Sequence, residues 1–143
     1  MDRNELASMN DENGLAMELT SKRMVYCSLK GEAPTEKAIM FKSMNNPAMR
    51  IKDEINKVIM AKDLYCETVE LLDQETGELI SAPRIVIIDD EGVGHVAVSK
   101  GIFNAVKKLI QVFGQPTWAI PIPLEIKQIS KGVYNILTFD VKI

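Results

Sequence analysis

The chain has 143 residues, of which 46% are hydrophobic and 26% are charged, and its net charge is −3. This length and composition are ordinary for one soluble globular domain, with or without an extension. They exclude a membrane-spanning helix, because no apolar run approaches the ~20 residues that such a helix needs. The N-terminus carries no basic-then-apolar signal pattern, so we expect a cytoplasmic protein that does not associate with a membrane.

Charge is distributed unevenly along the chain. Residues 1–20 have a net charge of −4, residues 21–60 of +4, residues 61–100 of −6 and residues 101–143 of +3. A local basic track can therefore exist on an acidic protein, as a polyanionic partner would require. Ordinary solvated surface explains the same pattern equally well.

Residues 1–20 are polar and acidic, which predicts a mobile N-terminal arm. A purely solvating arm rarely carries as many apolar side chains as this one, which contains Leu6, Met9, Leu15, Met17 and Leu19. These side chains indicate either a short helix that docks on its own domain or an arm that docks on a neighbouring subunit. The second alternative predicts a homo-oligomer.

A helical extension is predicted within residues 21–55. Pro34 suits the first turn of a helix, where a missing N–H group is tolerated, and the sequence Asn45-Asn46-Pro47 ends the helix. The buried stripe of this helix would consist of Ala38, Ile39, Phe41 and Met44.

The remaining residues, 56–143, begin with three strand-like runs. The first run, 58–72, ends at a turn of polar residues and glycine. The second run, 79–89, contains four consecutive apolar residues at 85–88, which imply burial on both faces of the strand or one face covered by another segment. A second glycine-containing turn then leads to the third run, 94–99.

An amphipathic helix follows the third run. Ser99 is a plausible N-cap, and Gly114 with Pro116 marks the C-terminal end. Apolar residues recur at helical spacing and form a stripe of Ile102, Val106, Leu109, Ile110 and Phe113. Lys107 and Lys108 lie outside this stripe.

Two further strand-like runs pair as a hairpin through a turn at 130–132. Apolar and polar residues alternate in both runs, so each strand has one buried and one exposed face. Glu125 and Lys127 lie on the exposed face of the first strand, and Tyr134 and Thr138 on that of the second. Because the sequence stops within the last strand, no C-terminal interaction tail is expected.

The order of these elements, strand-strand-strand-helix-strand-strand, predicts the fold. It is the order of the five-stranded OB-fold barrel, a mainly β architecture that typically binds oligonucleotides or oligosaccharides on one face and in two loops. The helix would close one end of the barrel. The predicted organisation is thus an N-terminal arm (1–20), a helical extension (21–55) and an OB-fold domain (56–143).

Catalytic and metal-binding chemistry is not expected. His95 is the single histidine, and nothing in the sequence supports pairing it with Cys27 or Cys66 as a nucleophile. The two cysteines lie far apart, which argues against a disulfide framework. There is no glycine-rich phosphate loop and no zinc-ligand spacing. We therefore expect neither an enzyme nor a bound cofactor or metal.

A binding surface for single-stranded nucleic acid remains, which requires a basic groove and aromatic rings on which bases stack. Trp118, in the loop after the helix, either caps the barrel or offers such a ring. Tyr134 lies beside Lys131 in the loop between the last two strands, a usual ligand contact in this architecture. The candidate nucleic-acid-binding residues are Tyr65, Arg84, His95, Trp118, Lys127, Lys131 and Tyr134. Lys107 and Lys108 are expected to contribute less, because the helix would lie away from the usual binding face.

Several segments of the sequence resemble a known family. They are 62–65 (Lys-Asp-Leu-Tyr), 74–78 (Gln-Glu-Thr-Gly-Glu), 82–84 (Ala-Pro-Arg), 97–102 (Ala-Val-Ser-Lys-Gly-Ile) and 113–118 (Phe-Gly-Gln-Pro-Thr-Trp). They are similar to small single-stranded DNA-binding proteins of phages and conjugative plasmids in Gram-positive bacteria. The resemblance, which covers roughly residues 45–143, implies an OB-fold, sequence-independent binding of single-stranded DNA and a role in DNA replication or transfer. It is also compatible with assembly along DNA through an N-terminal arm.

Two alternative functions remain open. One is a protein-interaction module, such as a phage-encoded host inhibitor, with the strand at 85–88 or the Trp118 loop as its contact. The other is a small RNA-binding OB protein. Salt separates the first alternative from DNA binding, because binding to phosphates weakens steeply with salt and an apolar protein interface does not. Competition between matched DNA and RNA oligonucleotides separates the second.

Overall fold

The structure is a computed structural model and describes residues 25–143, so the predicted arm, residues 1–20, lies outside the described residues. No helix of the described part is long and apolar enough to cross a membrane. The elements, in chain order, are β1 (Val25–Cys27), α3 (Pro34–Asn45), β2 (Met49–Arg50), a 3-10 turn η1 (Ile51–Asp53), β3 (Val58–Leu72), β4 (Leu79–Asp89), β5 (Gly94–Val98), α4 (Lys100–Phe113), β6 (Ile122–Lys131) and β7 (Tyr134–Val141).

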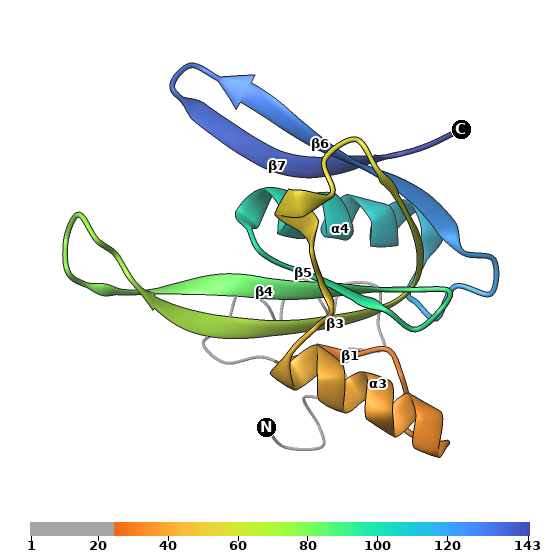
Figure 1. The fold of residues 1–143 in the computed structure, drawn as a ribbon. Helices are drawn as coiled ribbons and strands as arrows, with labels where there is room; N and C mark the ends of the chain where they lie inside the picture. The colour runs from red at the N-terminus through yellow and green to blue at the C-terminus, as the bar shows by residue number, and fades with distance from the viewer. Residues whose placement is uncertain (1–24) are drawn as a thin grey trace.

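One curled sheet contains all seven described strands, in the order β2-β5-β4-β3-β6-β7, with β1 added to β3 (Figure 1). The long strand β3 causes the curl, since its residues 58–61 pair with β6 and its residues 61–72 pair with β4. The register shifts between Ala61 and Asp63, an irregularity of the kind that bends a strand. The predicted order of three strands, one helix and two strands is confirmed for residues 58–141.

The closed five-stranded barrel predicted from the sequence is wrong in detail, because the sheet is a half-barrel. In a closed barrel the last strand would pair with the third, whereas β7 pairs only with β6 among the described strands. The free edge of β5 is taken instead by β2, which pairs with it in parallel at Met49↔His95 and Arg50↔Val96. The segment before the barrel thus occupies the edge at which the barrel would close.

Helix α4 lies inside the curl, between the β6–β7 hairpin and the part of the sheet formed by β3, β4 and β5 (Figure 1). The Ser99 hydroxyl caps it by accepting a hydrogen bond from the Ile102 N–H at 3.1 Å, as expected. Gly101 allows α4 to approach β7 closely, because a Cβ atom there would lie 2.1 Å from the carbonyl oxygen of Leu137. Burial along the helix stops at Ile110, so the prediction that Phe113 is buried is wrong: its side chain is 47% exposed.

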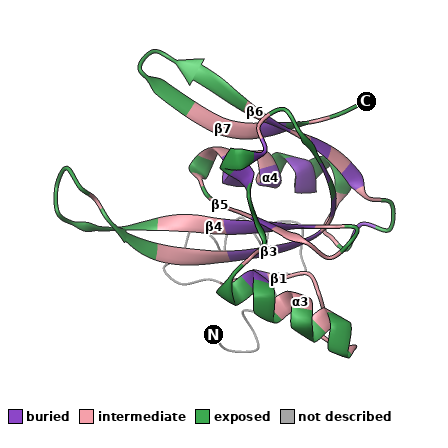
Figure 2. Cartoon of the chain, in the orientation of Figure 1, coloured by how far each residue is buried: buried purple, intermediate pink, exposed green. Residues whose placement is uncertain are grey.

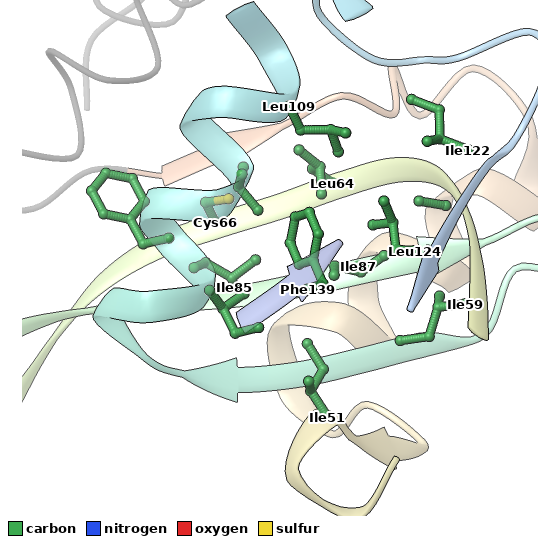
Figure 3. Close-up of a cluster of buried hydrophobic side chains, with 14 of the residues drawn as sticks. Ile51, Ile59, Leu64, Cys66, Ile85, Ile87, Leu109, Ile122, Leu124 and Phe139 are labelled. Carbon is green, nitrogen blue, oxygen red and sulfur yellow. The ribbon is translucent and has the colours of Figure 1, made fainter. Parts of the chain in front are cut away.

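The main core fills the space between α4 and the concave side of the sheet (Figure 3). A second, smaller cluster lies on the opposite side of the sheet, where Tyr65, Val86 and Ile88 are covered by residues of β1, the following loop, α3 and β5. The two clusters confirm that residues 85–88 are buried on both faces of β4. This run therefore offers no contact surface to a partner.

The stripe predicted for α3 is confirmed only at Ile39 and is wrong at the other three residues. Ile39 packs against the second cluster, but Phe41 and Met44 are 65% and 54% exposed, and Ala38 is exposed as well. The buried residue one turn after Ile39 is Ser43, whose hydroxyl donates a 2.8 Å hydrogen bond to the Ile39 carbonyl. Because α3 rests on the sheet through this narrow strip, its larger apolar side chains point to solvent.

Candidate nucleic-acid interface

The β6–β7 hairpin projects beyond the core and ends in the two-residue turn at 132–133 (Figure 2). Its strands alternate, so one side packs into the core through residues such as Ile126 and Phe139. Register places Lys127 opposite Thr138, Ile129 opposite Ile136 and Lys131 opposite Tyr134 on the other side. We call these six residues the hairpin face. Lys127, Tyr134 and Thr138 lie on this face, as the alternation of the two strands predicts.

Lys131 and Tyr134 are the most accessible of the predicted contacts. They are direct cross-strand neighbours, and the Tyr134 side chain is 73% exposed. Within the described part of the chain Lys131 forms no ion pair. Lys127 is partly compensated, because its Nζ atom lies 3.3 Å from Glu125 Oε1, although 42% of its side chain stays exposed. The tip thus presents an aromatic ring beside an uncompensated amine.

A groove of about 540 Å³ runs between α4 and the β6–β7 hairpin, and residues from both sides of the hairpin line it. Its walls are largely aliphatic and aromatic, and Lys108 and Lys131 bring an amine from each side. One carboxylate, Asp140, also lines it. We call it the α4–β7 groove.

Tyr65 and Arg84 lie on the other side of the sheet, around one carboxylate. The Tyr65 hydroxyl donates to Glu67 Oε2 at 3.2 Å, and Arg84 Nη1 lies 3.1 Å from Glu67 Oε1. Burial, reinforced by Glu67, raises the pKa of the Tyr65 phenol, and only 1% of Tyr65 is exposed. Neither side chain is therefore placed to meet DNA in this structure: the ring is covered and the guanidinium charge is compensated.

His95 is also buried, between two carboxylates. Its Nδ1 lies 2.7 Å from Glu54 Oε2, and its Nε2 lies 2.9 Å from Asp89 Oδ2. The imidazole thereby links β5 to the residue after η1 and to the end of β4. These contacts explain the burial of the ring and leave neither ring nitrogen free for a phosphate.

Trp118 closes the core at the connection between α4 and β6. Only 6% of it is exposed, and its indole N–H donates to the Gly114 carbonyl at 3.1 Å. Its backbone N–H donates to the Lys62 carbonyl at 3.0 Å. Of the two roles left open by the sequence, this geometry is that of a cap, and stacking on a base would need the ring to leave the core.

Comparison with known proteins decides the family. The family model described as "Phage Single-stranded DNA-binding protein" matches residues 19–142. The chain belongs to this family. The predicted resemblance is confirmed, and the match is wider than the resemblance, because it also covers β1 and α3. No curated protein and no solved structure matches the chain significantly.

For a member of the phage single-stranded DNA-binding protein family, exposed aromatic rings are of direct interest, and sequence reasoning missed two of them. Phe41 and Phe113 were assigned to buried stripes by their helical spacing, but they are 65% and 47% exposed. The available signal for Phe113 was its position as the last residue before the helix-ending Gly114. Phe113 lines the α4–β7 groove, whereas Phe41 lies on α3.

The described residues offer neither a metal site nor a reactive thiol. No group of three or more histidine, cysteine or acidic residues within 25–143 is arranged to hold a metal ion. The two cysteines are free, and burial raises the pKa of the thiols of both Cys27 and Cys66. Both thiols are therefore held in the protonated, less nucleophilic form.

Proposed function

We propose that this phage-family protein binds single-stranded DNA without sequence preference and without catalysis, in phage or plasmid DNA replication or transfer. The observation that carries the proposal is the exposed pairing of Lys131 and Tyr134 at the tip of the β6–β7 hairpin. This hairpin corresponds to a loop that usually contacts ligands in OB-folds.

The chemistry of the hairpin face suits sequence-independent binding. An aromatic ring can stack on any base, and such stacking is worth roughly 1–3 kcal/mol per base. Lysine amines attract phosphates whatever base they carry. Lys127 and Lys131 lie on the same face as Tyr134, so the face can hold a strand by its backbone while the ring engages a base.

Replacing Tyr134 by alanine is expected to weaken binding to an oligo-dT by roughly 1–3 kcal/mol and to leave the melting temperature unchanged, because the ring is exposed. Fluorescence anisotropy with labelled oligo-dT measures the affinity. Val133→Ala is the matched control, since this neighbour is 90% exposed and carries neither ring nor charge. Equal losses in both variants would contradict a stacking role for Tyr134.

The same assay separates the alternatives. Removing Lys131 should lower the slope of log affinity against log salt by about one unit if the amine meets a phosphate. Lys42→Ala, on α3, controls for the loss of one positive charge elsewhere. An interaction whose strength does not change with salt would favour the protein-interaction module. Competition by a matched RNA oligonucleotide as strong as by DNA would favour the RNA-binding alternative.

We further propose that the arm, residues 1–20, links subunits into a homo-oligomer and does not bind DNA. The support comes from the sequence of the arm. Its net charge of −4 repels phosphates, and its five apolar side chains would be buried favourably against a protein surface. The entropic cost of docking the arm on a neighbouring subunit is lower when many subunits are already bound along one DNA strand.

Deleting residues 1–20 is expected to leave the melting temperature and the affinity for a short oligo-dT near wild type, and to abolish higher-order complexes on long DNA. Light scattering on a short and a long oligo-dT measures this. A full-length variant with Leu6, Met9 and Leu15 changed to serine keeps the length and charge of the arm, and it should behave like the deletion. Complexes of wild-type size on the long strand would indicate instead an arm that folds onto its own domain.

A further inference from the structure

The α4–β7 groove continues the hairpin face. The two surfaces share four residues, namely Ile129, Lys131, Ile136 and Thr138. A DNA strand held at the tip of the hairpin can therefore reach the groove without crossing the core. The opposite wall is α4, which lines the groove along its length from Gly101 to Phe113 and contributes Lys108. The volume of about 540 Å³ lies within the range of roughly 300–1,000 Å³ typical of ligand sites.

Lys108 is free to bind a phosphate, in contrast to its neighbour. Lys107 places its Nζ atom 4.8 Å from the centre of the Phe103 ring, a cation–π contact that holds the amine against the helix. Among the residues that the structure describes, Lys108 forms no ion pair, and it is exposed at the groove. The acidic side chain in the groove, Asp140, accepts a hydrogen bond from the Val141 N–H at 2.9 Å and keeps its negative charge, but the two lysines of the groove outnumber it.

Phe113 provides the aromatic part. It is the last residue of α4 and is 47% exposed, although its spacing would place it on the buried stripe. An exposed aromatic ring in the same groove as two uncompensated amines combines the two features of sites for single-stranded nucleic acid, namely a stacking platform and a cationic track.

We propose that single-stranded DNA passes from the hairpin face into the α4–β7 groove, where Phe113 stacks on a base and Lys108 contacts a phosphate. This inference rests on the proposed function and extends the DNA path onto α4. It reverses the expectation from the sequence that this helix lies away from the DNA.

The test compares two matched pairs by anisotropy with a short oligo-dT over a series of salt concentrations. Phe113→Leu is expected to weaken binding roughly 5- to 150-fold, and Phe113→Tyr to restore it, whereas Phe41→Leu should have no effect. Lys108→Ala should lower the salt slope by about one unit, whereas Lys107→Ala should not. Thermal melting of each variant verifies that it is folded, and the tyrosine variant keeps the test valid if the leucine variant is unstable.

Three results would overturn the inference. Wild-type affinity and slope in Phe113→Leu and Lys108→Ala, with Tyr134→Ala still impaired, would remove the groove from the path while leaving the proposed function intact. If Phe113→Leu and Lys108→Ala bind the short oligonucleotide normally but no longer assemble on long DNA, the groove receives the acidic arm of a neighbouring subunit instead of DNA. No binding of oligo-dT by the wild-type protein would remove the proposed function itself.

Discussion

Replacing Trp118 by alanine is expected to destabilise the fold by about 3–5 kcal/mol, the usual cost of removing a large aromatic side chain from a core. The indole is 6% exposed, packs in the main core and donates a hydrogen bond to the Gly114 carbonyl. Its loss would leave a cavity where the connection from α4 to β6 crosses the core. Urea denaturation followed by circular dichroism measures the free energy of unfolding.

Two variants sharpen this measurement. Trp118→Phe keeps most of the ring volume and loses the hydrogen bond, so it should cost much less than Trp118→Ala. Tyr134→Ala should cost almost nothing, since that ring is 73% exposed. If Trp118→Ala instead melted like the wild type and lost affinity for oligo-dT, the indole would be a stacking platform and its buried position would not describe the DNA-bound protein.

Replacing His95 by alanine is expected to destabilise the protein by roughly 3–5 kcal/mol, because it leaves two carboxylates facing each other without their common partner. The side chains of His95 and Glu54 are each 7% exposed and that of Asp89 is 16% exposed, so water can compensate only in part. The loss should also loosen β2 and η1, which the imidazole ties to the edge of β5.

Urea denaturation again gives the measurement, and Val98→Ala on the same strand is the control, since Val98 is 45% exposed. Hydrogen exchange adds a local readout: the amides of residues 49–54 should exchange faster in His95→Ala than in the control. Full stability combined with weaker binding of oligo-dT would mean that His95 is a DNA contact, as the sequence alone predicts.

These two variants and those of the hairpin divide the predicted contacts into two groups. Trp118 and His95 are expected to act through stability, and Tyr134 and Lys131 through affinity at unchanged stability. The separation matters because a destabilised protein also binds less DNA whenever part of it is unfolded. Affinities are therefore compared only under conditions in which each variant is folded.

Much of the architecture follows from the sequence. Alternation along residues 122–141 determines which side chains of the hairpin face outward, because successive residues of a strand point to opposite faces. The spacing of Ile102, Val106, Leu109 and Ile110 determines the buried side of α4, because its apolar residues recur at helical period. The order of the elements then predicts an OB-like arrangement, and the curled sheet of the structure is consistent with it.

Only the tertiary structure shows which segments cover each face of the sheet and of α4. Periodicity assigns Tyr65 to one side of β3 but carries no information about the α3 and β1 residues that cover that side. Nor does it show that β2 takes the edge of β5 and so leaves the barrel open. Helical spacing likewise placed Phe113 in the core, yet burial ends at Ile110, so the ring lies in a groove beside Lys108. Local pattern depends on neighbours in the chain, whereas the accessibility of a binding residue depends on long-range packing between distant segments.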